Sequence, residues 1–100
     1  MNEILAQKMI GKIVLVGVTI KNKNEEILKQ EQLFGTVLRI NEKEGLIIRC
    51  GITGEEKWLP PAPEEYEPAK AGDYKLRSTG HVVTNPDFIA SFTRYPKESH

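Results

Sequence analysis

The stretch Phe34–Cys50, FGTVLRINEKEGLIIRC, decides the predicted fold. Side chains alternate along residues 34–40, which indicates a β-strand. Asn41–Gly45 is expected to form a tight turn into a second strand, Leu46–Cys50. Gly35 lies inside the first strand, where it permits a sharp bend or a bulge. Because strongly bent strands let a small sheet curl onto itself, we expect a mainly β fold, a bent meander that closes into a small barrel.

One helix and further strand residues precede this hairpin. The β-branched run Ile13–Ile20 predicts a strand that is apolar on both faces, which is typical of a central strand or of one covered by another element, here the N-terminal helix. A long extended stretch is expected from about Glu26 onward. Asn2 can cap a short helix that Gly11 ends, so residues 1–10 are predicted to form a helical lid. The predicted buried face of this helix consists of Ile4, Leu5 and Met9.

The chain after the hairpin divides into a connection and additional C-terminal strands. A short strand is expected to end near Leu59, and prolines then make residues 60–72 an acidic connection without ladder pairing. Strands are expected at residues 74–78, 81–84 and 88–95, with a turn at residues 78–80 and a frayed tail at residues 96–100. Residues 1–100 are thus one domain.

Composition argues against several classes of protein. The 14 basic and 14 acidic residues balance, whereas dedicated nucleic-acid binders show a basic excess. The single cysteine, Cys50, permits no internal disulfide. The apolar run after Lys12 is too short to span a bilayer, and no export signal precedes it. We therefore expect a cytoplasmic protein with no membrane partner.

Catalytic and cofactor signatures are missing from the sequence. No phosphate-binding glycine loop, dinucleotide fingerprint or zinc-ligand spacing occurs. His81 has no acid or nucleophile signature nearby, and Cys50 fits a buried strand position. These features predict a protein that is not an enzyme and holds neither a cofactor nor a metal.

Acidic and aromatic residues gather between residues 55 and 67. Electrostatic complementarity speeds association and aromatic side chains supply binding energy, so this segment fits a basic protein surface. We predict a protein-binding module such as an adaptor, an inhibitor or a toxin-neutralising immunity protein. The alternative without a binding role is a solvated loop whose tryptophan, Trp58, is anchored in the core. The predicted contact residues are Glu55, Glu56, Trp58, Glu64, Glu65, Tyr66 and Glu67.

A second hypothesis is a small barrel that binds RNA. Cations on strands, together with exposed aromatics, form platforms for single-stranded nucleic acid. Ordinary outward charges that prevent edge-to-edge pairing are the alternative explanation. The apolar strand from Ile13 also suggests a homodimer interface, since edge strands readily pair. The residues proposed for the nucleic-acid face are Arg39, Arg49, Lys75 and Arg77.

The run Gly35–Ile40 followed by Gly45–Ile48 resembles the bent hairpin of SH3-like and Sm-like barrels. The resemblance covers about residues 2–60 and implies the order of a helix followed by a bent meander. The aromatic motifs with which SH3 domains hold proline peptides are not matched. Asn41 and Glu42 only approximate the Asp and Asn positions with which Sm-like proteins hold uridine. The resemblance therefore implies a fold and no binding residues.

Overall fold

The structure is a computed structural model that describes residues 2–77 and 79–96. Within these residues, six strands form one sheet in the order β4-β3-β2-β1-β8-β5, and β6 and β7 form a separate hairpin. The predicted frayed tail falls outside the described residues from residue 97 on, as does Ser78 of the predicted turn. The elements in chain order are α1 (Glu3–Met9), β1 (Ile13–Lys21), β2 (Ile27–Asn41), β3 (Gly45–Cys50), β4 (Glu56–Leu59), the 3-10 helix η1 (Pro63–Glu65), β5 (Glu67–Pro68), β6 (Asp73–Lys75), β7 (Val82–Thr84) and β8 (Phe88–Arg94).

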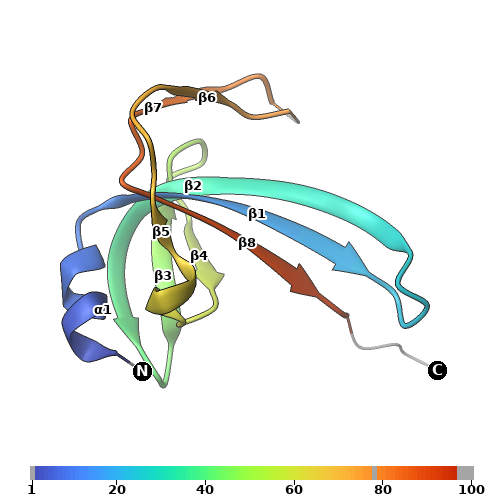
Figure 1. Cartoon of the computed structure of the whole chain (residues 1–100), viewed down its shortest axis with the longest axis horizontal. Coiled ribbons are helices and arrows are strands. Elements are labelled where there is room, and N and C mark those ends of the chain that lie inside the picture. Colours follow the sequence, from blue (N-terminus) through green and yellow to red (C-terminus); the bar gives the residue numbers. More distant parts are fainter. Residues whose placement is uncertain (1, 78, 97–100) are drawn as a thin grey trace.

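The long strand β2 takes part in two halves of the sheet. Its first half pairs with β1 up to Thr36, and its second half pairs with β3 from Gly35 onward. The changeover falls at the predicted bend, and Figure 1 shows β2 curving away from β1. A register shift follows between Val37 and Arg39. Because a bulge adds one residue to the strand, Val37 and Ile40 are both buried, and the predicted strict alternation is wrong here.

The predicted barrel closure is not found. β1 to β4 form the predicted antiparallel meander, but β4 and β5 stand at opposite ends of the sheet and do not pair. The mainly β class is confirmed. β8 runs parallel to β1, a pairing that the sequence did not predict. The prediction that residues 60–72 lack ladder pairing is wrong in part, because Glu67–Pro68 pairs with the start of β8.

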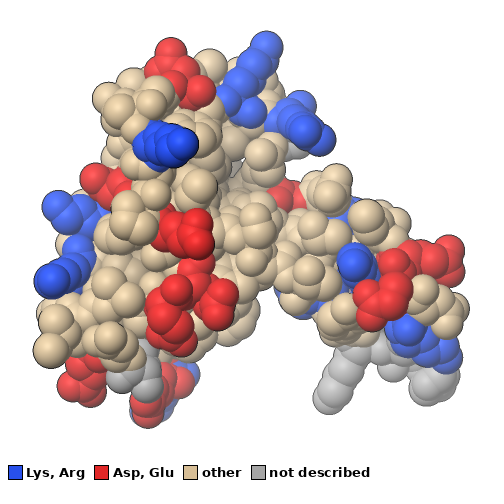
Figure 2. Space-filling model, viewed as in Figure 1, with Lys and Arg blue, Asp and Glu red and all other residues tan. Residues whose placement is uncertain are grey.

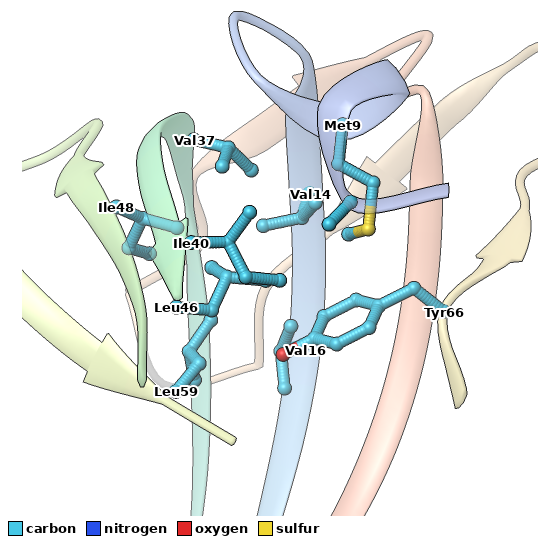
Figure 3. Packing of buried hydrophobic residues seen from close by; sticks show 10 residues of the cluster. Met9, Val14, Val16, Val37, Ile40, Leu46, Ile48, Leu59 and Tyr66 are labelled. Carbon is cyan, nitrogen blue, oxygen red and sulfur yellow. The ribbon is translucent and has the colours of Figure 1, made fainter. Parts of the chain in front are cut away.

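The main core lies inside the curve of β1 to β4. Figure 3 shows Val14 and Val16 of β1 facing Leu46 of β3, with Tyr66 entering from the opposite side. The predicted N-terminal helix is present, and the Asn2 side chain accepts a hydrogen bond from the Leu5 N–H at 3.1 Å. Its buried face differs from the prediction in part, because Ala6 and Met9 are buried whereas Ile4 is 75% exposed.

A smaller core lies on the other face of the sheet. Leu15 of β1 packs there with Leu76 and Val83 of the β6–β7 hairpin. The hairpin therefore covers one end of this face, as the upper layer in Figure 1. Beyond it, β1, β2 and β8 continue as a three-stranded arm that leaves the body of the molecule (Figure 1). Within residues 2–77 and 79–96, no helix has the length and apolarity needed to cross a membrane.

Candidate functional site

The five glutamates of the predicted acidic segment fall into two groups. Glu55 forms an ion pair with Lys57 at 3.2 Å, and Glu56 forms one with Arg39 at 2.7 Å. Arg39 also contacts Glu44 at 3.0 Å. Hydrogen bonds from the Asn41 amide and then from Arg39 lower the pKa of Glu44. Glu55 and Glu56 thus have cationic neighbours of their own.

Glu64, Glu65 and Glu67 form the second group, here called the acidic strip. Glu64 and Glu65 lie on η1 and Glu67 on β5, and all three are exposed. Across the part of the chain that the structure describes, none of the three forms an ion pair. Figure 2 shows acidic side chains gathered over η1 and β5. The acidic strip is therefore an uncompensated negative surface.

Local packing fixes the acidic strip. Pro63 starts η1 and is buried, which suits a residue whose missing N–H is not needed there. Tyr66 lies between the acidic residues but points inward and is 3% exposed. Its hydroxyl donates a hydrogen bond to the Pro60 carbonyl at 3.1 Å, and its ring lies 5.4 Å from that of Phe92. Burial raises the pKa of the Tyr66 phenol. Tyr66 therefore anchors the strip from below and is not part of the surface.

Trp58 lies on the outer face of the sheet. It is opposite Ile47 in the β3–β4 ladder, whereas the neighbouring Leu59 faces the core. The indole is 56% exposed and lies against Gly45, where a Cβ atom would collide with the ring. Trp58 is thus available at the surface, and the alternative in which it anchors the core does not hold.

One edge of the sheet beside the acidic strip is open. β5 pairs only with Phe88 and Ile89 of β8, so residues 90–94 have a partner on one side only, β1. A shallow depression lies where this edge begins, lined by Glu65, Glu67, Ile89, Ala90 and Ser91. The sequence reasoning missed this edge. The sequence feature that could have indicated an open edge is the strand FIASFTR itself, in which Arg94 is the single charged residue.

The residues proposed for a nucleic-acid face lie on different elements of the fold. Arg39 and Arg49 lie on β2 and β3, whereas Lys75 and Arg77 belong to the β6–β7 hairpin region. Arg39 is engaged by two carboxylates, as described above, and Arg49 donates to the Gly54 carbonyl at 3.2 Å. Arg39 and Arg49 thus already have hydrogen-bond acceptors within the chain.

His81 and Cys50 are the only histidine and cysteine among the residues that the structure describes. His81 is exposed, and its ring stacks on Phe34 with a centroid distance of 4.9 Å. Among residues 2–77 and 79–96, no three His, Cys, Asp or Glu side chains lie close enough to hold a metal ion. Cys50 is buried at the end of β3.

Comparison of the chain with protein-family models, with curated proteins and with solved structures gives no match. The function is therefore inferred from the geometry of the acidic strip and its surroundings.

Proposed function

We propose that this chain is a non-enzymatic protein-binding module whose acidic strip contacts a basic partner. The observation that carries the proposal is the contrast between the two acidic groups. Glu55 and Glu56 have ion-pair partners, whereas Glu64, Glu65 and Glu67 are exposed without one in the described part of the chain. Three unpaired carboxylates on a fixed surface attract a cationic surface and speed its association.

The proposal fits a cytoplasmic adaptor, inhibitor or toxin-neutralising immunity protein. All three act by covering a partner surface and need no catalytic group. RNA binding is less well supported, because Arg39 lies between two carboxylates that compete with phosphate. The doubly apolar strand from Ile13 no longer favours a homodimer, because β1 is paired on both sides by β2 and β8.

The test compares two triple variants of equal net charge. In the first, Glu64, Glu65 and Glu67 become Gln, and in the control Glu3, Glu26 and Glu55 become Gln. Each variant changes the net charge by the same amount, so only the position of the charge differs. A partner isolated from the host with the wild-type chain is purified, and its association rate is measured at low salt. We expect a loss of about tenfold in the strip variant only, removed at high salt. Equal rates for the two variants would overturn the proposal.

A further inference from the structure

The two open edges of the main sheet differ in how they are protected. β4 is short, carries Glu56 and Lys57 and is followed by Pro60 and Pro61, all features that discourage pairing with another strand. β8 has seven residues, with one charged side chain and no proline. Natural proteins usually block an edge of this kind. The edge of β8 beyond Ile89 is therefore exceptional within this fold.

Backbone groups of β8 are presented at this edge. Glu67 lies opposite Ile89, and the Ala69 N–H donates to the Asp87 carbonyl at 3.1 Å. Since the direction of the backbone groups alternates along a strand, the N–H and C=O groups of Ser91 and Thr93 face the same side. No strand among the described residues pairs with them there. Both residues are exposed, so an added strand can reach them.

The chain itself leaves this position free. β5 is antiparallel to β8, and its continuation toward the N-terminus would run beside Ser91 and Thr93. The chain instead forms η1, where Pro63 is buried, and so turns away from β8. The depression between Glu65, Glu67 and Ser91 lies at the point of departure. An extended segment entering there would continue the line of β5.

The side chains around the edge define the chemistry of such a segment. Glu67 shares a face of the sheet with Ile89, and Ser91 and Thr93 follow on that face. Cationic side chains of the segment on this face would lie near the acidic strip. Phe92, on the opposite face, is half-buried and offers an apolar surface. The two faces thus favour different residue types.

We propose that the open edge of β8 binds a basic, extended peptide segment of a partner protein, added as an antiparallel strand in line with β5. The segment alternates Lys or Arg toward Glu67 with apolar residues toward Phe92. Main-chain hydrogen bonds would supply affinity, and the alternating side chains would supply specificity. The inference rests on the proposed function and adds to it the conformation and the residue pattern of the partner.

The test uses an acetylated and amidated eight-residue peptide that alternates Lys and Val. Binding is measured by calorimetry at low salt, and amide exchange of the chain is followed with and without the peptide. We expect slower exchange of the Ser91 and Thr93 amides, because both become hydrogen-bonded donors. A peptide N-methylated at alternate residues, on the N–H groups that would face β8, should bind about tenfold more weakly. A peptide of the same pattern with Glu in place of Lys should not bind.

Two variants of the chain separate this inference from the proposed function. Thr93→Pro removes an N–H that faces outward, so its pairing with β1 is retained while the edge is blocked. The Gln triple of the acidic strip leaves the edge intact. We expect about tenfold weaker peptide binding in each. Because a proline can disturb a strand, the N-methylated peptide supplies the same test on the unchanged chain.

The outcomes are distinguishable. Binding that depends on the acidic strip but ignores N-methylation and leaves Ser91 and Thr93 exchanging freely would overturn the added strand and keep the proposed function. Binding that is insensitive to the Gln triple would overturn the proposed function. No binding of the peptide would overturn the inference. Protection of Ser91 and Thr93 that rises with protein concentration alone would make a second copy the occupant and overturn it as well.

Discussion

Replacing Tyr66 by phenylalanine removes one hydrogen bond beneath the acidic strip. The hydroxyl reaches the Pro60 carbonyl at 3.1 Å, where the chain passes from β4 toward η1. A hydrogen bond of this kind contributes about 1 kcal/mol net to stability. Pro60 is half-exposed, so water can replace the lost donor. We therefore expect the free energy of unfolding to fall by about 1 kcal/mol, with the strip still in place.

Tyr66→Ala should have a much larger effect. It removes a side chain that is 3% exposed and packs with Phe92, and truncation of a buried aromatic costs about 3–5 kcal/mol. Since domains of this size have stabilities of about 5–15 kcal/mol, a large part of the total would be lost. Partner binding should weaken too, because Glu65 and Glu67 lose the anchor between them. Tyr66→Phe should keep binding at the wild-type level.

Urea unfolding followed by circular dichroism measures both changes, provided that the slope with denaturant stays constant. Tyr95→Phe is the matched control. Tyr95 is 53% exposed and donates to Glu25, so its replacement should leave the unfolding midpoint close to that of the wild type. The reasoning is refuted if Tyr66→Ala is no more destabilising than Tyr66→Phe, because the ring would then not be buried against the core.

The close backbone approach at Gly35 and the pKa shifts of Tyr66 and Glu44 can each be tested. Gly35→Ala should cost about 1–3 kcal/mol in urea unfolding, because the added Cβ collides with the backbone of β3. Gly17→Ala is the control, because its Cβ would make only an ordinary contact with the Ser91 hydroxyl at 3.9 Å, and it should be neutral or slightly stabilising. Equal costs for the two variants would contradict the close approach at Gly35. Because the pKa of Tyr66 is raised in the folded chain, Tyr66 ionises first in the unfolded chain, and above about pH 10 the free energy of unfolding should fall by about 1.4 kcal/mol per pH unit. Tyr66→Phe should reduce this slope, and an unchanged slope would contradict the raised pKa of Tyr66. In an NMR titration the Glu44 carboxyl should protonate below its usual pH range. Its stabilising contribution is therefore present at neutral pH and is lost on acidification through its folded pKa. Asn41→Ala should return the pKa of Glu44 toward its usual value, and an unchanged pKa would contradict the hydrogen bond from Asn41.

Local signals in the sequence predicted much of the fold. Asn2 and Gly11 bound the helix as expected, and short turns connect β1 to β4 in the predicted meander. These features depend on neighbouring residues, such as the side chain that caps the helix and a glycine with positive φ at Gly45. Such features can be predicted from the sequence because each depends on residues only a few positions apart.

Long-range pairing could not be predicted in the same way. β1 and β8 are joined in parallel although about seventy residues separate Val14 from Phe88, and no local pattern encodes that choice of partner. The bulge after Val37 and the inward direction of Tyr66 depend on packing against other elements. For the site, the sequence identified the acidic residues. That Glu55 is ion-paired whereas Glu67 is not could not be predicted, because it depends on where the fold places the cationic side chains.

The measurement that tests the central claim most directly is an amide-resolved NMR map of the chain bound to its purified partner. The account predicts that chemical shifts change at residues 63–69 and 88–94, where the acidic strip adjoins the open edge of β8. Changes confined to the strands that carry Arg39 and Arg49, or to the β6–β7 hairpin, would contradict it.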